Sequence, residues 1–563
     1  MADGTADGAR ELTSDLAGGA WAYPDVCVVG AGPAGLLLAH ELSASGLHVL
    51  VLEGGPAAPP VGGVDVTSTT STGLPYSPVA TRSSGVGGSS LRWTVETPLG
   101  PGFVRLKELD ASDFEPRDLL GVSGWPFGRA ELEPHYDRAR EVLGLPPRDE
   151  TRDTGVGGVL ERRVYGFTPA TVFTHDLPAV LRSRPTVRLA AGWTVTDVHT
   201  DGASEAVTSL TCRSATGARA SVRARAFVLA GGGIENARLL LASRSRYADG
   251  LGNHHDLVGR YFMEHPHYVS GVLRGRPTAP PTAWDLVAPH GTIRQEKYVL
   301  APSVRAAQGV LDAVYKVKPF TAARLPLGHD GRLDQEGLDA WTGARDALRG
   351  YSRVSGVTQA SRPSPVAWAE LVRATPAVAR HAGMRLADRV RSGVGRPPVQ
   401  RHGHRVMVMA EQEPSPLSRL RLTDALDPFG VPRAELDWRL TPLDRHSMVR
   451  GQQLAAPDLA RVVGAAVVTT LGPDGALRPD GGAHHIGTTR MSRSPRSGVV
   501  DEDCRVHGVP NLFVTGSSVF PVGGAANPTL TILALASRLA HRLAAELAVT
   551  GARGTRLPRV SSL

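Results

Sequence analysis

Three glycines near the N-terminus have the spacing that binds the pyrophosphate of a dinucleotide. Gly30, Gly32 and Gly35 form the pattern GxGxxG. The first glycine permits a tight turn, the second lets a pyrophosphate approach the backbone, and the third lets the following helix pack on the preceding strand. Glu53 follows at the distance where a carboxylate accepts hydrogen bonds from ribose hydroxyls and disfavours a phosphorylated ribose. The spacing therefore predicts a site for an adenine dinucleotide.

The segments around these residues have the order of a β-α-β unit. Residues 25–29 are predicted as a short apolar strand, 30–35 as a turn, 36–44 as an apolar helix and 48–52 as a second apolar strand. This order is what a parallel sheet requires. The N-terminus of the helix then faces the phosphates, because its free N–H groups favour an anion.

Two later segments also bring glycines to the end of a structural element. Residues 83–93, SSGVGGSSLRW, are too rich in Gly and Ser for an element interior, and Trp93 favours a backbone cradle over a flexible linker. Apolar residues 227–230 lead into three consecutive glycines and a predicted helix that begins near Glu235. Both segments are typical of cofactor-binding loops.

The C-terminal part contains the last informative segment. Residues 511–516 predict a strand that ends at Gly516. Asn527 has the position of an N-cap and Pro528 that of the first residue of a long Ala- and Leu-rich helix. This helix ends before a tail that we expect to be disordered.

Length and composition describe a globular protein with several domains. The chain has 563 residues, 41% of them hydrophobic and 21% charged, a balance too apolar for a disordered chain. The length predicts roughly two to four domains. No run approaches the ~18 apolar residues that span a membrane, and residues 1–19 lack the basic flank and apolar core of a signal peptide. We therefore expect a cytoplasmic protein with no membrane partner.

The basic charge does not indicate a nucleic-acid partner. The formal net charge is +8, but only four of the 62 basic residues are lysines, as expected from a GC-rich coding bias. The arginines are scattered and accompany no nucleic-acid-binding motif, so we expect no nucleic acid as a partner.

The cysteines and histidines give no metal-binding pattern. Cys27, Cys212 and Cys504 are odd in number and have no CxxC spacing, which predicts neither a disulfide framework nor a cysteine zinc site. Three histidine pairs are expected to be surface or core residues, not ligands: His254 with His255, His265 with His267, and His402 with His404. Glu411, Gln412 and Glu413 either bind polar groups of a substrate or end a strand in solvent.

The motifs, in their order along the chain, resemble those of the glucose-methanol-choline (GMC) oxidoreductases, which are FAD-dependent alcohol oxidases and dehydrogenases. The matching segments are GAGPAG with Glu53, GVGGSSLRW, AGGGIENARLL, HHIGTTRM, NLFVTGSSVFP and NPTLTILALA. They extend from about residue 24 to residue 550, and residues 271–400 contain no match. The segments EQEPSP and LDWRLT are similar to members that act on sugars and related polyols.

The resemblance implies an α/β fold with a discontinuous Rossmann-like FAD-binding domain and a substrate domain built on a mostly antiparallel sheet with a helical insertion. We expect FAD-binding segments at 20–105, 186–270 and 470–550, a connecting or cap segment at 106–185, and a substrate-binding domain at 271–469. Residues 1–19 and 551–563 are expected to be flexible termini.

The same resemblance implies which residues hold FAD. Gly30, Gly32, Gly35 and Glu53 are expected to bind its ADP half. The residues expected along the pyrophosphate and flavin are Gly87, Gly88, Ser89, Ser90, Gly516, Ser517, Asn527, Pro528 and Thr529. Members with a covalent flavin carry a histidine where this chain has Arg92, so we expect noncovalent FAD.

The family pattern H-x-x-G-T implies that His484 is the catalytic base. A neutral imidazole suits the removal of a hydroxyl proton, because its ordinary pKa is about 6.5. Asn527, before Pro-Thr, is expected to hydrogen-bond the same hydroxyl oxygen. Two alternatives stay open: His485 is the base, or Asn527 is only a helix cap.

These implications predict oxidation of an alcohol to a carbonyl by hydride transfer to flavin N5. The expected substrate is a sugar, aminosugar, glycoside or other hydroxylated natural product, with O2 or another electron acceptor as the second partner. One alternative is a flavin-dependent monooxygenase, which shares the N-terminal unit but lacks the HHIGT and NPT motifs. Another is a flavin-binding family member without redox turnover. The oligomeric state is left open.

Overall fold

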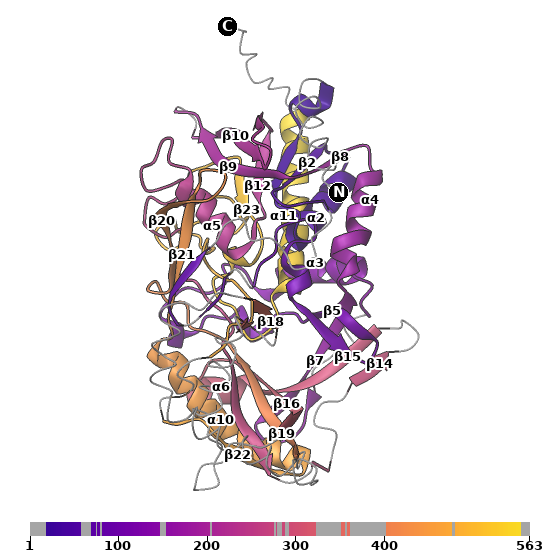
Figure 1. Cartoon of the computed structure of the whole chain (residues 1–563), viewed down its shortest axis with the longest axis vertical. Coiled ribbons are helices and arrows are strands. Elements are labelled where there is room, and N and C mark those ends of the chain that lie inside the picture. The colour runs from indigo at the N-terminus through magenta and orange to yellow at the C-terminus, as the bar shows by residue number, and fades with distance from the viewer. Residues whose placement is uncertain are drawn as a thin grey trace, which may run out of the picture.

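The computed structural model describes most of the chain and has two lobes (Figure 1). One lobe contains a five-stranded sheet and the other a ten-stranded sheet, which confirms the predicted α/β fold class. The described residues are 19–57, 69–74, 76–78, 81–146, 154–202, 205–274, 277–278, 284–287, 292–322, 351–354, 357–360, 401–473, 475 and 479–552. Apart from residues 19, 551 and 552, the expected flexible termini lie outside the described residues, and so does most of the 320–400 segment.

The five-stranded sheet is parallel and has the order β23-β12-β1-β2-β8. Its strands are β1 (Val26–Val29), β2 (Val49–Glu53), β8 (Val187–Ala191), β12 (Ala226–Leu229) and β23 (Leu512–Val514). The central strands are apolar except for Glu53 at the end of β2, since both faces of a parallel sheet are covered. Segments far apart in the sequence thus meet at the carboxyl edge of one sheet, where ligands bind in such folds.

Helices pack beside this sheet (Figure 1). Helix α2 (Pro33–Ala44) contacts α11 (Thr529–Ala552), which also contacts α3 (Arg129–Val142). Helix α2 begins at Pro33, three residues before the predicted start, because proline is favoured in the first turn. Helix α5 (Gly232–Ala242) follows β12, and α4 (Leu177–Ser183) packs on α2.

The ten-stranded sheet is antiparallel throughout. Its path is β22-β13-β19-β16-β15-β7-β5-β4, with β14 beside β15 and β6 beside β7. The strands are β4 (Thr94–Thr97), β5 (Gly100–Leu106), β6 (Thr154–Gly155), β7 (Leu160–Pro169), β13 (His267–Arg274), β14 (Trp284–Val287), β15 (Thr292–Leu300), β16 (Ala313–Ala322), β19 (Arg401–Ala410) and β22 (Ala466–Thr469). Strands β4 and β5 belong to this sheet, although the expected division assigned residues 20–105 to the FAD-binding domain.

The two faces of the large sheet have different neighbours. On one face, Leu300, Tyr315 and Val317 pack with residues of α10 (Pro442–Val463). On the other, Val299, Val314 and their neighbours form an apolar cluster with Ala525, which lies two residues before Asn527. The second face is therefore turned toward the loop that carries Asn527.

Smaller elements complete the fold. A three-stranded sheet contains β9 (Trp193–Thr200), β10 (Val207–Ser214) and β11 (Arg219–Val222), and another contains β3 (Thr70–Gly73), β20 (Arg419–Leu426) and β21 (Pro432–Trp438). Strands β17 (Tyr351–Val354) and β18 (Val357–Ala360) form a hairpin, and α6 (Pro302–Gln308) follows β15. The short helical turns are η1 (Gly19–Ala22), η2 (Gly88–Arg92), η3 (Ala111–Asp113), η4 (Asp118–Leu120), η6 (Val172–Asp176) and η7 (Ser517–Val519).

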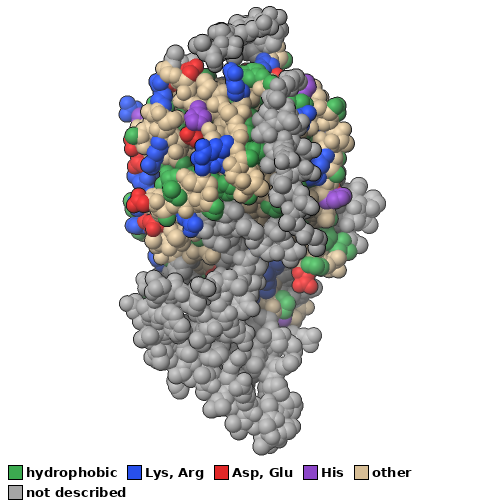
Figure 2. All heavy atoms as spheres, turned by 45° about the horizontal axis from the view of Figure 1, so that its top comes forward, with side chains coloured by type: hydrophobic (Ala, Val, Ile, Leu, Met, Phe, Trp, Pro, Cys, Tyr) green, Lys and Arg blue, Asp and Glu red, His purple; other side chains and the backbone are tan. Residues whose placement is uncertain are grey.

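The surface and the cysteines are unremarkable for a globular protein. Basic and acidic side chains are interspersed on the described part of the face drawn in Figure 2. Cys27, Cys212 and Cys504 are buried free thiols. No helix in the described ranges combines the length and the hydropathy needed to cross a bilayer.

Candidate active site

The glycine motif forms a cradle between two loops. Gly30 has a φ of +108°, and a Cβ there would lie 2.7 Å from the carbonyl oxygen of Ala230. A Cβ at Gly35 would overlap the carbonyl oxygen of Gly30. At Gly32, in contrast, the nearest atom to such a Cβ is the Cα of Gly88, at 4.0 Å. Gly32 thus faces open space beside the second glycine loop.

This space suits the pyrophosphate of FAD. Helix α2 starts there with Gly32 as its N-cap residue, and no side chain caps it. Its first N–H groups and its dipole therefore favour an anion. The amide of Gly87 donates to the carbonyl oxygen of Ala31 at 2.9 Å and holds the two loops together. The expected pyrophosphate-binding glycines of both loops lie side by side.

Glu53 ties the same loops together. Its carboxylate accepts hydrogen bonds from the backbone N–H groups of Ala31 at 2.9 Å, Gly55 at 2.8 Å and Gly85 at 2.9 Å. A carboxylate offers about four acceptor positions. One position, on Oε2, is left for a ribose hydroxyl, so Glu53 can both position the loops and contact the ribose.

The segment after the second glycine loop is held by its own side chains. Ser90 Oγ donates to the carbonyl oxygen of Gly87 at 2.8 Å, and Ser89 Oγ accepts from the amide of Ser83 at 3.2 Å. Arg92 Nε donates to Ser83 Oγ at 2.8 Å, and burial lowers the pKa of its guanidinium. Arg92 therefore lies beside the loop expected to contact the flavin.

The C-terminal loop brings further expected FAD residues to the same region. Gly516 follows β23 with a φ of +108°, and a Cβ there would meet no atom within 4 Å. Ser517 Oγ donates to the carbonyl oxygen of His485 at 2.6 Å. Thr529 is the first residue of α11. The carbonyl oxygen of Pro528 accepts a hydrogen bond from the amide of Ile532 in the first turn of this helix. Pro528 therefore has the capping position, and the predicted N-cap role of Asn527 is wrong.

The structure brings His484 and Asn527 together. Asn527 Nδ2 lies 3.0 Å from His484 Nε2, and Asn527 Oδ1 has no hydrogen-bond partner among the described residues. Both side chains are buried, with residue exposures of 6% and 7%. The two polar groups converge on one point, where a single hydroxyl can reach both.

A hydrogen-bond chain defines which nitrogen of His484 is basic. His265 Nε2 lies 2.8 Å from the carbonyl oxygen of Gly524, which can only accept, so this nitrogen carries the hydrogen. Neutral His265 then has a bare Nδ1, which accepts from His484 Nδ1 at 2.8 Å. His484 therefore exposes the lone pair of Nε2 toward Asn527, the tautomer that a base requires.

Electrostatics keep this imidazole neutral. Burial, followed by the charges of His265, His267 and Arg105, holds the pKa of His484 well below its ordinary range. Burial and neighbouring charges also lower the pKa of His267 to about 3. The site thus holds a deprotonated base at neutral pH.

Glu264 positions both histidine segments. Its carboxylate accepts from the backbone N–H groups of Gly482 and His484, each at 2.6 Å, and of His265 at 3.0 Å. It also accepts from Tyr76 Oη at 2.6 Å. Burial raises the pKa of Glu264 to about 7 against these donors. One side chain therefore fixes the backbone on which His484 and His265 stand.

His485 has other partners. Its Nε2 lies 2.7 Å from Tyr76 Oη and 3.0 Å from Thr81 Oγ1. Thr81 Oγ1 donates to the carbonyl oxygen of Pro78 at 2.9 Å. Because Tyr76 and Thr81 already donate elsewhere, His485 Nε2 donates to both. The geometry thus gives His484 the basic nitrogen beside Asn527 and gives His485 a donor role.

The segment MEHPH was underestimated from the sequence. His265 and His267 were expected to be surface or core residues, but His265 contacts His484 directly and the ring of His267 lies 6.2 Å from that of His484. The available signal in the sequence was the presence of three ionisable residues, Glu264, His265 and His267, within five positions. A separation of 219 residues between His265 and His484 hid their contact.

The first two residues of the acidic run after β19 are buried, so the expectation of a strand end in solvent is wrong for Glu411 and Gln412. Glu411 is buried and forms a two-point ion pair with Arg117, at 2.8 and 2.6 Å. Gln412 is also buried, and its Oε1 accepts from the amide of Glu264 and from Trp438 Nε1, each at 2.9 Å. Gln412 therefore supports the site indirectly by holding Glu264.

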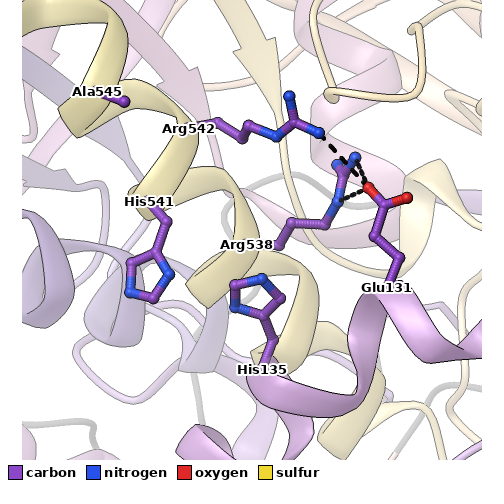
Figure 3. Close-up of a pocket in the computed structure, with 6 residues that line it drawn as sticks. All are labelled: Glu131, His135, Arg538, His541, Arg542 and Ala545. Atoms are coloured by element: carbon purple, nitrogen blue, oxygen red, sulfur yellow. Dashed lines mark hydrogen bonds and ion pairs between the residues drawn. The ribbon is translucent and has the colours of Figure 1, made fainter.

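Figure 3 shows a separate hollow of about 290 Å³ between α3 and α11. It is lined by Glu131, His135, Arg538, His541, Arg542 and Ala545. Arg538 and Arg542 both point to Glu131 (Figure 3), and both also pair with Asp503, so the local charges are compensated. Arg538 lies about 14 Å along α11 from Thr529, two residues after Asn527. This hollow is distinct from the histidine site.

No group of three or more His, Cys, Asp or Glu side chains that could hold a metal occurs in the part of the chain that the structure describes.

Two family models match the chain. The model described as "GMC oxidoreductase" matches residues 414–536, a range that contains His484 and Asn527. The model described as "Lycopene cyclase protein" matches residues 25–67, the region that contains β1, α2 and β2.

The chain is similar to curated enzymes over almost its whole length. It is 26% identical to paromamine 6'-oxidase of Streptomyces fradiae, over 93% of this chain and 92% of that protein. It is 25% identical to 2-methyl-1,2-propanediol dehydrogenase of Mycolicibacterium austroafricanum, over 91% of this chain and 94% of that protein.

A solved structure has the same fold. The structure is an arginine-to-alanine variant of formate oxidase from Aspergillus oryzae RIB40, described for the effect of this mutation on FAD modification. It matches with a TM-score of 0.50 and 17% identity over 93% of this chain and 98% of that chain. GMC oxidoreductases are FAD-binding flavoproteins. The C-terminal model match at residues 414–536, the similarity over the whole length and the arrangement of the glycine loops with the His484–Asn527 pair all agree with the resemblance of this chain to the GMC oxidoreductases.

Proposed function

We propose that this protein oxidises a hydroxyl group of a sugar-like small molecule to a carbonyl, with His484 as base and FAD as cofactor. The observation that carries the proposal is the 3.0 Å approach of Asn527 Nδ2 to His484 Nε2, in a chain whose tautomers leave that nitrogen basic. The names of the relatives, an oxidase of paromamine and a dehydrogenase of a diol, support an alcohol as substrate.

His484 and Asn527 have complementary tasks. The substrate hydroxyl donates its proton to His484 Nε2, while Asn527 Nδ2 donates to the hydroxyl oxygen and orients the carbon that loses the hydride. The alcohol thus loses one proton and one hydride and becomes a carbonyl compound. Burial of both side chains excludes water from the reacting oxygen.

His265 keeps the base in the productive tautomer. Before the reaction it accepts the hydrogen of His484 Nδ1, and it continues to accept it when His484 gains a proton. The carbonyl oxygen of Gly524 fixes the ring of His265 in turn. The proton on His484 is therefore held at a nitrogen whose partners do not need to rearrange.

FAD fits the residues of this chain. The glycine loops with Gly32 and Gly88 would hold its pyrophosphate, Glu53 would contact the ribose, and residues of the loop from Gly516 to Thr529 would contact the flavin. When bound, FAD would supply the acceptor for the hydride, and O2 or another electron acceptor is the expected second partner.

We further propose that FAD is bound noncovalently. Arg92 has the position of the histidine that links covalent flavins, and a guanidinium group does not form a stable covalent bond to a flavin. Acid precipitation is expected to leave all of the flavin in the supernatant. Flavin that stays with the precipitate contradicts this part of the proposal.

The experiment that tests the function is anaerobic titration of the purified holoenzyme. Sugars, amino sugars, glycosides and simple alcohols are added separately, and the visible flavin spectrum is recorded. Bleaching by one class supports the proposal, and later admission of O2 separates an oxidase from a dehydrogenase. A flavin that no alcohol reduces, but that NADPH reduces, refutes the proposal and indicates a monooxygenase.

A further inference from the structure

The lysines of this chain are concentrated in one place. Only four lysines occur, and three of them, Lys297, Lys316 and Lys318, lie on the adjacent strands β15 and β16. Arginine replaces lysine almost everywhere else, so coding bias does not explain the cluster. The position of these three side chains in the sheet therefore calls for a physical explanation.

Strand register places the three lysines on one face of the large sheet. Val299 of β15 is paired with Val314 of β16. Lys297 lies two residues from Val299, and Lys316 and Lys318 lie two and four residues from Val314, so all share the face of that pair. Arg105 of β5 is on the same face. It is paired across the strands with Phe167, which is paired with Ile293, and Ile293 lies four residues before Lys297 on β15. We call Arg105, Lys297, Lys316 and Lys318 the basic face.

The basic face is turned toward the catalytic loop. Val299, Val314, Phe167 and Ile293 pack in one cluster with Ala525, close to Asn527 in sequence. The opposite face of the sheet packs on α10 instead, as Figure 1 shows in the lower lobe. Members of the basic face also act on the site. The pKa of His267 is lowered first by burial, then by His265, and then by the charges of Arg105, Lys297 and Lys318.

Burial along the basic face changes from one end to the other. Lys297 is only 3% exposed and its Nζ lies 3.5 Å from the ring centroid of Tyr165. Lys316 is half-buried and donates to Gln295 Oε1 at 2.8 Å, whereas Lys318 is exposed. Gln295 Nε2 and Tyr165 Oη, both buried, have no partner among the described residues. The face thus combines a solvent-accessible end with buried donors.

The cations of the basic face repel one another. Arg105 and Lys318 act on Lys316, and Arg105 and Arg405 act on Lys318. Desolvation of the ammonium groups and these charges lower the pKa of Lys316 to about 6 and that of Lys318 to about 8, and they hold the pKa of the buried Lys297 well below its ordinary value. Arg163 of β7, beside them, is paired with Asp110 and Asp312.

An anion is the ligand that relieves this repulsion, since charges removed from water are stable when they are paired. We propose that the basic face binds an anionic group, a carboxylate or a phosphate, of the alcohol whose hydroxyl is oxidised at His484. This inference rests on the proposed function and names its substrate class: an acidic or phosphorylated sugar-like alcohol. It also implies that the site disfavours amino sugars, because an ammonium group would face the cationic side chains of Arg105 and Lys318.

Binding is tested first without turnover. Inorganic phosphate and glucuronate are titrated separately into the holoenzyme by calorimetry at neutral pH, in two buffers that differ in ionisation enthalpy. We expect binding with proton uptake, because the anion favours the protonated form of Lys316. Lys316→Met and Lys318→Met should each weaken binding at least tenfold. Arg294→Met is the matched control, because Arg294 also lies on β15 but its side chain is on the opposite face of the sheet.

Anaerobic flavin reduction then compares glucose, glucuronate, glucose 6-phosphate and glucosamine. Faster reduction by either acidic sugar, lost in Lys318→Met but not in Arg294→Met, supports the inference and tells carboxylate from phosphate. Faster reduction by glucose or glucosamine, with no anion binding, overturns it and leaves the proposed function intact. Lysine-dependent anion binding without reduction by any alcohol supports the anion site and refutes the proposed function.

Discussion

The contact between His265 and His484 leads to a quantitative prediction for His265→Ala. The substitution removes the acceptor of the His484 Nδ1 hydrogen, at 2.8 Å, in a buried site. An unsatisfied buried donor costs about 1–3 kcal/mol. The ring avoids this cost by placing its hydrogen on Nε2, which cannot then accept a proton. If the whole cost enters the barrier, kcat for alcohol oxidation falls about 5- to 160-fold.

Stopped-flow reduction of the flavin under anaerobic conditions measures this loss, and the visible spectrum verifies that FAD is bound. His265→Gln supplies an amide oxygen as acceptor and should recover part of the rate. His265 also helps to lower the pKa of His484, so His265→Ala should add an acidic limb to the pH profile. An unchanged rate and pH profile, or a loss only in FAD content, refutes the positioning role.

Three further predictions concern the cradle, the base and its support. Gly32→Ala should fold normally, because the φ of −78° at this position suits alanine, but it should bind FAD at least tenfold more weakly. Gly35→Ala should instead lower the melting temperature, since the added Cβ would overlap the carbonyl oxygen of Gly30. Flavin content and thermal unfolding distinguish the two variants. The reduction rate should stay constant from about pH 8 to pH 6, because a lowered pKa keeps His484 neutral on acidification, and an apparent pKa near 6.5 contradicts this. Glu264→Gln should destabilise the holoenzyme by about 1–3 kcal/mol or more, because the amide NH2 faces backbone N–H groups; an unchanged denaturation midpoint contradicts this.

The nucleotide-binding unit was predictable from local sequence. The apolar strands and the glycines lie within thirty residues of one another, so their periodicity and spacing define β1, α2 and β2 without distant contacts. The predicted helix start was late only because Pro33 and Gly35 resemble turn residues. The contact between Glu53 and the amide of Gly85 was not predictable, because it joins loops 32 residues apart.

The surroundings of the base were predictable only in part. His484 and Asn527 come from the family pattern, whereas His265 and Glu264 reach the site through tertiary folding. The orientation of Lys297, Lys316 and Lys318 depends on which strands pair and in which register. Because β5, β7, β15, β16 and β19 come from distant segments, no local periodicity reveals a common face. Register is a property of the folded sheet, and a shift by one residue reverses every side chain.

The measurement that tests the central claim most directly is anaerobic flavin reduction by the best alcohol of the panel, in the wild type and in His484→Ala. Both proteins should contain equal FAD, and the account predicts bleaching in the wild type and none in His484→Ala on the same timescale. His175→Ala, which changes an exposed histidine, is the control and should behave like the wild type. Equal reduction rates in the wild type and in His484→Ala would contradict the assignment of His484 as the base.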